Sequence, residues 1–260
     1  MTAGTERDRE PDSELVSIIM PTYNCGAFIG ETIATVQAQT HSRWELLVVD
    51  DCSTDDTAEV VAALAENDPR IHYVRLETNS GAAMARNRAM ELAQGRYMAF
   101  LDSDDLWHPD KLRRQIDFMA SRGVAMSCTA YAQIDEQGAP TGKIVRSPAR
   151  TSYNRLLLDC PVGNSTVMYD VARLGKFEVP NIRKRNDDAL WLRMLRTERY
   201  IWGMPVVLMR YRLRSGSVSA NKRSLVKYHW TLYRDIEHLS VPRSVFHIGV
   251  WILIKALKVK

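Results

Sequence analysis

The segment Tyr97–Asp105, with the sequence YMAFLDSDD, joins an apolar run directly to three carboxylates. The run Tyr97–Leu101 predicts a buried strand, so the carboxylates are expected at the C-terminal end of that strand. Ligands bind at this edge in open α/β sheets. Carboxylates this close repel one another unless a cation or donor groups lie between them, and oxygen ligands favour Mg²⁺ or Mn²⁺. The segment therefore predicts either a metal site or an Asp-rich turn in solvent.

Alternating strand and helix patterns surround this segment. Short apolar runs rich in β-branched residues predict buried strands, and the stretches between them have helical spacing. In chain order the expected elements are strand 15–20, helix 27–39, strand 44–49, helix 53–64, strand 71–76, helix 82–94, strand 97–101 and a helix that begins at Pro109. This alternation with short connections is typical of a Rossmann-like, mostly parallel sheet that is flanked by helices.

The 260 residues, 45% of them hydrophobic, are enough for one substantial core with a small appendage. The expected parts are a polar N-terminal tail at 1–13, an α/β domain at 14–216 and a basic helical extension at 217–260. Beyond residue 125 the pattern is less regular, with a helix expected at 187–196 and a strand pair at 201–211 that Pro205 interrupts.

The four cysteines are widely spaced without a CxxC pair, which favours reduced thiols in a cytosolic protein.

The net charge of +4 is unevenly distributed along the chain. The segment from Arg210 to Lys260 has 11 basic and 2 acidic residues, a local net charge of +9, and the rest of the chain carries −5. This distribution favours an anionic surface or substrate over general nucleic-acid binding.

The apolar run Val245–Ile254 is too short to span a bilayer, which takes about 20 residues. Since lysines follow it, the run predicts either a helix at a membrane surface or a helix packed on the protein or on a partner subunit.

Polar clusters accompany two other predicted strands and one helix start. Pro21–Asn24 (PTYN) ends the first strand, and the ring of Tyr23 offers a face on which a base can stack. The pair Asp50–Asp51 ends the second strand, at the same edge of the sheet. The turn Asn79–Gly81 lets the backbone approach a ligand, with Arg86 available to an anion. Each cluster alone also fits an ordinary turn or helix start, but together they predict one binding site.

These motifs resemble the family 2 glycosyltransferases of GT-A fold. The matching segments, in that family's order and spacing, are VSIIMPTYN (16–24), QTHSRWELLVVDDCSTD (39–55), NSGAAMARN (79–87), FLDSDD (100–105) and NDDALWLRM (186–194). The resemblance covers about residues 15–221, which is most of the chain. The stretches 182–193 and 211–222 are most similar to bacterial enzymes that build capsular, teichuronic-acid or lipopolysaccharide-type glycans.

The resemblance implies an inverting enzyme that transfers a hexosyl or hexosaminyl group from a nucleotide-diphosphate sugar, with Mn²⁺ or Mg²⁺ as cofactor. UDP is the expected nucleotide. The residues implied to bind the nucleotide are Pro21, Thr22, Tyr23, Asn24, Asp51, Gly81, Arg86, Asp102 and Ser103. Asp102 and Asp104 are the implied DxD pair, with Asp102 toward the ribose and metal and Asp104 on the metal that bridges the diphosphate. Asp105 is expected behind this pair.

In the family a carboxylate deprotonates the acceptor hydroxyl, and Asp187 matches its position. Asn186 stands where the family usually has an acid, so the neighbouring Asp188 competes with Asp187 for the role of base. Asn186 or Asp187 also fits a helix N-cap. We place Asn186 and Trp191 on the acceptor side, although the helical spacing of Trp191 from Asp187 favours core packing.

Arg212, Arg214 and Ser217 are candidates for a mobile flap that closes over the diphosphate, since guanidinium groups pair with phosphate in a bidentate manner. The alternative for these arginines is ordinary surface charge. His41 and His108 have no partners at ligand spacing and are expected to be structural.

The expected partners are a nucleotide-sugar donor, a lipid-linked saccharide acceptor, an anionic membrane surface and, in an oligomer, a second subunit. The expected location is the cytoplasm, at the inner face of the cell membrane. A sugar nucleotidyltransferase is disfavoured because Pro21–Asn24 occupies the place of its Gly-rich loop. A nucleotide-sugar-binding pseudoenzyme would keep the DxD pair and lose the base. No nucleic-acid docking motif is present in the sequence.

Overall fold

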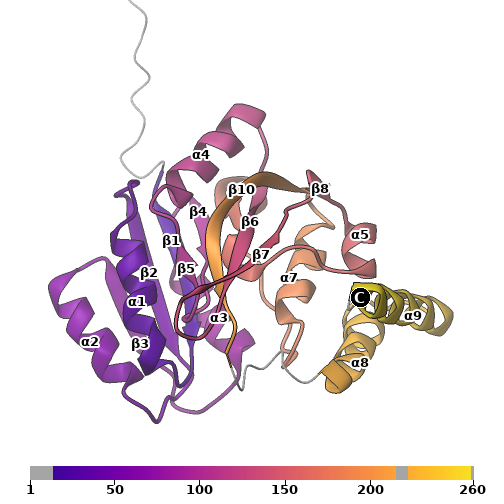
Figure 1. Cartoon of the computed structure of the whole chain (residues 1–260), viewed down its shortest axis with the longest axis horizontal. Coiled ribbons are helices and arrows are strands. Elements are labelled where there is room, and N and C mark those ends of the chain that lie inside the picture. The colour runs from indigo at the N-terminus through magenta and orange to yellow at the C-terminus, as the bar shows by residue number, and fades with distance from the viewer. Residues whose placement is uncertain (1–13, 215–221, 259–260) are drawn as a thin grey trace, which may run out of the picture.

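The computed structural model describes residues 14–214 and 222–258 (Figure 1). The strands in this part of the chain are β1 (Val16–Thr22), β2 (Trp44–Asp50), β3 (Ile71–Arg75), β4 (Tyr97–Phe100), β5 (Leu106–Trp107), β6 (Met126–Ile134), β7 (Pro140–Val145), β8 (Arg150–Thr151), β9 (Met168–Asp170) and β10 (Ile201–Arg212). They form one sheet with the order β3-β2-β1-β4-β9-β6-β10-β5, in which β7 pairs with β6 and β8 with β10.

Helices cover both faces of the sheet. They are α1 (Gly26–Gln37), α2 (Thr57–Asn67), α3 (Ala82–Leu92), α4 (Lys111–Arg122), α5 (Tyr153–Leu158), α6 (Val171–Leu174), α7 (Asn186–Met194), α8 (Lys222–Thr231) and α9 (Val241–Lys258), with a 3-10 turn η1 (Asn164–Thr166) and a π-helical turn η2 (Leu232–Ile236). Apolar side chains of α1, α2 and α4 pack on one face of the sheet. Those of α3, α5 and α7 pack on the other face.

The N-terminal half of the sheet is parallel, as the sequence predicts. β1 lies between β2 and β4, with Ile19 aligned with Leu47 on one side and with Phe100 on the other. All residues of β1 and β2 are buried, because helices cover both faces. This explains why both strands are continuous apolar runs in the sequence. The carboxyl ends of β1, β2 and β4 meet at one edge of the sheet, the lower edge in Figure 1.

The C-terminal half of the sheet is mixed, and one prediction there is wrong. β9 pairs antiparallel with both β4 and β6, while β10 pairs parallel with β6. The expected strand pair at 201–211 is the single strand β10. Met204 of β10 lies opposite Thr129 of β6, and Val207 lies opposite the next residue, Ala130. The two residues of β10 between Met204 and Val207 therefore have no partner on β6. The intervening Pro205, which has no N–H to donate, is therefore accommodated in a bulge instead of ending the strand.

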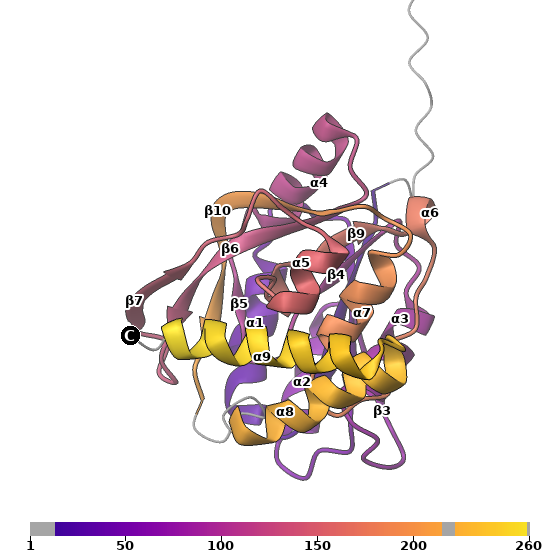
Figure 2. The ribbon, with the colours of Figure 1, turned by 90° about the vertical axis from the view of Figure 1, so that its right-hand side faces the viewer.

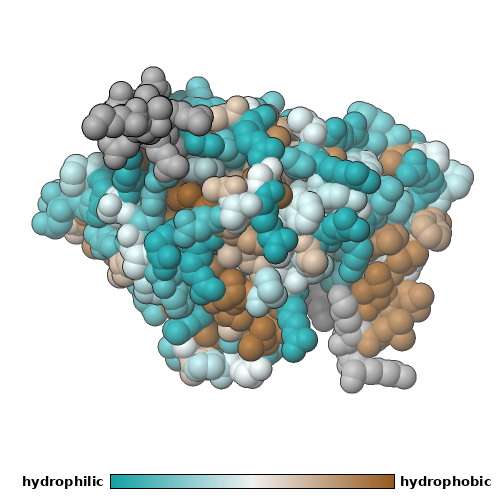
Figure 3. All heavy atoms as spheres, turned by 90° about the horizontal axis from the view of Figure 1, so that it is seen from above, coloured by the Kyte–Doolittle hydropathy of each residue, from teal (hydrophilic) through white to brown (hydrophobic). Residues whose placement is uncertain are grey.

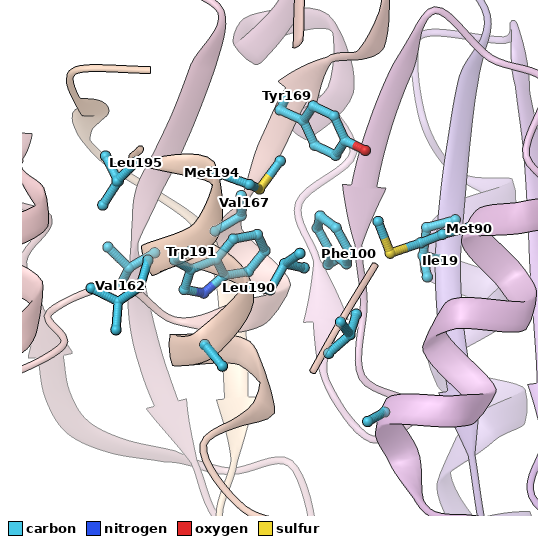
Figure 4. Packing of buried hydrophobic residues seen from close by; sticks show 14 of the residues in the cluster. Ile19, Met90, Phe100, Val162, Val167, Tyr169, Leu190, Trp191, Met194 and Leu195 are labelled. Carbon is cyan, nitrogen blue, oxygen red and sulfur yellow. The ribbon is translucent and has the colours of Figure 1, made fainter. Parts of the chain in front are cut away.

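The core on the α7 side of the sheet is centred on two aromatic rings. The ring of Trp191 lies edge-on to the ring of Phe100, with 4.9 Å between the centroids (Figure 4). Trp191 and Phe100 are both fully buried, and the ring of Tyr169 of β9 also stacks on Phe100, with 6.2 Å between the centroids. The structure thus corrects the acceptor-side expectation for Trp191, because a fully buried side chain cannot contact an acceptor.

The C-terminal helices pack on the same side of the protein, outside α5 and α7 (Figure 2). Leu232, Tyr233 and Leu239 are buried in the α7-side core. The ammonium of Lys255 on α9 pairs with the carboxylate of Asp159 at 2.8 Å. Among the described residues, no helix combines the length and the apolar character needed to cross a membrane.

We expect Trp191→Ala to lower the free energy of unfolding by about 3–5 kcal/mol, because it leaves a cavity beside Phe100. Trp230 on α8 is 40% exposed, so the control Trp230→Ala is expected to change this free energy by only about 0.5 kcal/mol. Urea unfolding followed by circular dichroism measures both values. Small and equal losses in the two variants would contradict the central position of Trp191.

Candidate active site

The carboxyl ends of β1, β2 and β4 surround a small cavity of about 140 Å³. Its lining residues are Pro21, Thr22, Tyr23, Asp51, Ala82, Arg86, Asp102, Ser103, Asp104 and Arg214. Apart from Ala82, all of them are residues that the sequence analysis singled out. Two buried polar atoms in this lining, Thr22 Oγ1 and Arg86 Nε, have no hydrogen-bond partner among the described residues. Since both residues line the cavity, a polar ligand there is a candidate partner for these atoms.

The three carboxylates after β4 have different surroundings. Asp102 Oδ1 accepts from Asn164 Nδ2 at 2.8 Å and pairs with Arg86 at 3.3 Å. Asp104 pairs with Arg214 at 3.0 Å. Asp105 is buried behind them, as expected, where it accepts from the Ser165 hydroxyl and from the backbone N–H of Arg212. Asp102 and Asp104 line the cavity, whereas Asp105 holds the turn in place.

Crowding and burial shift the titration of all three groups. Burial raises the pKa of Asp102 to about 6, with further contributions from Asp104 and Asp187 and an opposing one from Arg86. Burial also raises the pKa of Asp104, against the effect of Arg214. Burial and the charges of Asp104 and Asp102 raise the pKa of Asp105 well above its usual value. The turn therefore concentrates negative charge that a bound cation would stabilise.

Asp51 organises the loop that leads into α3. Its two carboxylate oxygens accept from the backbone N–H groups of Ser80 and Gly81, at 2.6 and 2.8 Å. Gly81 has a φ of +91°, a conformation that side chains disfavour, so glycine suits this turn. Asp51 lines the cavity and also fixes the loop, whereas Gly81 lies outside the cavity lining and donates its backbone N–H to Asp51. Asn24 lies outside the cavity lining, where its Oδ1 accepts from the N–H of Thr54 and ties two loops together.

Arg86 connects the carboxylate turn to α7. Its guanidinium donates to Asn186 Oδ1 and also pairs with Asp102. Arg86 and Asn186 are both buried. The first residue of α7 is thereby held next to the DxD pair, although the two are 84 positions apart in the sequence. The predicted place of Asn186 on the acceptor side stays a prediction.

Asp187 and Asp188 follow Asn186 and differ in their contacts. Asp188 is buried and pairs with Arg185 at 3.0 Å. Burial raises the pKa of Asp188 to about 6, to which the charge of Asp187 adds, while Arg185 and a hydrogen bond with Cys160 oppose it. Asp187 is half-buried and close enough to Asp102 to affect its titration. Asp187 is therefore the more accessible of the two candidate bases.

The arginines of the predicted flap occupy different environments. Arg212 is buried and donates to the carbonyls of Asp104 and Glu136 and to the carboxylate of Glu31. These contacts hold its side chain against the body of the protein, so the structure corrects the expectation that Arg212 moves as a flap. Arg214 is partly exposed and lines the cavity. Ser217 lies outside the described residues.

Two residues of the site are not predicted by the sequence. Asn164 and Ser165, in η1, contact Asp102 and Asp105, and the Ser165 hydroxyl also accepts from the Asp102 N–H. They lie in the irregular stretch where no element was predicted. The run Gly163–Thr166 (GNST) is a turn-forming cluster, but nothing in the sequence places it against β4.

Comparisons with known proteins agree with this geometry. The model of the family described as Glycosyl transferase family 2 matches residues 17–181. The chain belongs to glycosyltransferase family 2. It is 45% identical to the putative teichuronic acid biosynthesis glycosyltransferase TuaG of Bacillus subtilis, over 89% of this chain and 92% of that protein. It is 38% identical to the UDP-Glc:alpha-D-GlcNAc-diphosphoundecaprenol beta-1,3-glucosyltransferase WfgD of Escherichia coli, over 90% and 91%.

Solved structures establish the GT-A fold of this family 2 glycosyltransferase. S. aureus TarS in complex with UDP-GlcNAc matches with a TM-score of 0.69 at 20% identity, covering 91% of this chain and 71% of that one. The mannosyltransferase PcManGT from Pyrobaculum calidifontis, in complex with GDP-Man and Mn²⁺, matches with a TM-score of 0.60 at 20% identity, covering 96% and 78%. The predicted fold class and family are both confirmed.

The residues present fit a divalent cation that is shared with a substrate. Within residues 14–214 and 222–258, no group of three or more His, Cys, Asp or Glu side chains is arranged as a complete metal site. Asp102 and Asp104 instead offer two carboxylates beside a cavity. Mg²⁺ and Mn²⁺ are commonly held by one or two carboxylates together with substrate phosphates and water. This donor set fits a metal–diphosphate complex better than a metal alone.

The two arginines should respond differently to substitution in this family 2 glycosyltransferase. We expect Arg212→Gln to lower the free energy of unfolding by about 2–3 kcal/mol, because several buried hydrogen bonds to a charged group are lost. Arg214→Gln should change it by about 0.5 kcal/mol and weaken the binding of nucleotide diphosphates instead. Urea unfolding and calorimetric titration with UDP measure the two properties. The opposite pattern would assign the flap role to Arg212.

Proposed function

We propose that this enzyme transfers a hexosyl or hexosaminyl group from a UDP-sugar to a lipid-linked saccharide, with inversion at the anomeric carbon. The reaction serves bacterial surface polysaccharide synthesis at the cytoplasmic face of the membrane. The observation that carries this proposal is the connected set of Asp102, Asp104, Arg86 and Asp187. In this set the carboxylates to which we assign the metal-bound diphosphate lie close to a half-buried carboxylate on α7, which supports the proposal.

The donor half of the proposal rests on the cavity lining. The exposed ring of Tyr23 suits stacking on the base, and Thr22 Oγ1 supplies a hydrogen-bonding group without a protein partner. Asp102 and Asp104 would hold the divalent cation with the diphosphate. A cation in this position stabilises the negative charge that develops on the departing nucleotide. Arg214, which already lies beside Asp104, supplies a second positive charge to the same phosphates.

The acceptor half of the proposal rests on Asp187. Its carboxylate accepts the proton of the acceptor hydroxyl as that oxygen bonds to the anomeric carbon and the bond to the diphosphate breaks. A single displacement of this kind inverts the anomeric configuration. Asp188, already paired with Arg185, holds the start of α7 in place. A lipid-linked acceptor is supported by the relative WfgD, whose name specifies an acceptor carried on diphosphoundecaprenol.

The donor site can be tested by thermal denaturation with a panel of nucleotide diphosphates and nucleotide sugars, with and without Mn²⁺. We expect uridine nucleotides with Mn²⁺ to raise the melting temperature, because a ligand that binds only the folded state stabilises it. Asp104→Asn should abolish the metal-dependent part of this rise. Stabilisation by another nucleotide would correct the donor, and the absence of any shift would refute the DxD assignment.

The base can be tested with the matched pair Asp187→Asn and Asp188→Asn. We expect Asp187→Asn to lower kcat by about 10²–10⁴-fold while nucleotide-induced stabilisation is retained, since proton removal contributes this much to catalysis. Asp188→Asn should mainly lower the melting temperature, because Arg185 loses its buried partner. Rates of UDP release with the acceptor present measure kcat. Full activity in Asp187→Asn would exclude this residue as the base.

A further inference from the structure

The outward side of α9 is apolar. Six large apolar side chains of this helix are exposed, including Phe246 at 61% and Leu257 at 66%. The six residues are Val241, Val245, Phe246, Ile252, Leu253 and Leu257. Spacings of four and seven positions recur among them, which places them along one side of the helix. Figure 3 shows an extensive brown patch at the right-hand edge of the molecule, the side on which α9 lies in Figure 1.

The inward side of α9 is mixed, with polar residues beside the buried Trp251 and the half-buried Ile248. Ser244 and His247 are buried, and Lys255 pairs with Asp159. The buried Trp251 packs its ring on that of His229, with 4.4 Å between the centroids. A helix at the surface of a protein in water normally carries its polar residues on the outward side. The outward side of α9 therefore requires an apolar environment that water does not provide.

The charge of the C-terminal helices indicates what kind of partner binds the apolar side of α9. Residues 222–258, which form α8, η2 and α9, contain seven basic and two acidic residues, a net charge of +5, and Arg243 on α9 and Lys227 on α8 are exposed. A second copy of the chain packed on this surface would bring the same positive charge against it, which opposes association. Anionic lipid headgroups above acyl chains complement both the charge and the apolar residues. We propose that α9 lies in the plane of an anionic membrane surface, with this side embedded in it.

Membrane binding through α9 would place the catalytic helix close to the lipid. On its inward side, the ring of Trp251 lies 5.7 Å from the guanidinium carbon of Arg185. Arg185 immediately precedes α7 and pairs with Asp188, so about one helix diameter, roughly 10 Å, separates the membrane side of α9 from the start of α7. A lipid-linked acceptor in the same membrane would then reach Asp187 with its saccharide. This role rests on the proposed function, whereas binding to lipid does not require it.

Sedimentation of the full chain with lipid vesicles tests the proposal without donor or acceptor. The vesicles contain either phosphatidylglycerol mixed with phosphatidylcholine or phosphatidylcholine alone. We expect binding to the anionic vesicles, weaker binding as salt is added, and little binding to the neutral ones. The double variant Phe246→Ser with Leu253→Ser should bind the anionic vesicles about tenfold or more weakly. Ile144→Ser, on β7, removes an equally exposed apolar residue elsewhere and should bind as the wild type does.

Several outcomes would overturn the proposal. These are no binding of the wild-type chain, equal binding to neutral vesicles, or unchanged binding of the double variant. A dimer in sedimentation velocity that the double variant converts to a monomer would assign the surface to a second copy. Stabilisation by UDP with Mn²⁺ is measured on the same samples. If vesicle binding fails but UDP with Mn²⁺ still stabilises the protein, the membrane proposal is wrong and the proposed function is not affected.

Discussion

The crowding of carboxylates after β4 is the constraint on which the rest of the site depends. Asp102, Asp104 and Asp105 lie within four residues, and burial raises the pKa of each. Ordinary turns avoid this arrangement because like charges in a poorly solvated place destabilise the fold. The protein offsets part of the cost with Arg86, Asn164 and Ser165. The remaining negative charge faces the cavity and is available to a cation.

The same constraint links the proposed donor site to α7, which carries the proposed base. Arg86 is needed beside Asp102, and the guanidinium that serves there also binds Asn186 at the start of α7. An acid at position 186 would compete with Asp102 for that positive charge. The neutral amide keeps the hydrogen bond and leaves the charge for the DxD turn. Asp187, the next residue, is thereby positioned beside the site without being bound to Arg86 itself.

The sequence predicts the parallel half of the sheet and most of the cavity because continuous apolar runs and polar strand ends are local signals. It fails where roles depend on packing between distant segments. The helical spacing of Trp191 favours the core without excluding an acceptor site, and its full burial against Phe100 decides between them. Asn164 and Ser165 lie in a stretch without periodicity. Likewise the pattern of α9 predicts a helix but not which of its sides faces solvent.

The central claim is that Asp102 and Asp104 hold a divalent cation together with the diphosphate of a nucleotide sugar. Crystals grown with UDP and Mn²⁺, measured at a wavelength where manganese scatters anomalously, test it most directly. We expect one strong anomalous peak in contact with both carboxylates and with the UDP phosphates. Bound UDP without a peak at these carboxylates, or with a peak elsewhere in the chain, would contradict the claim.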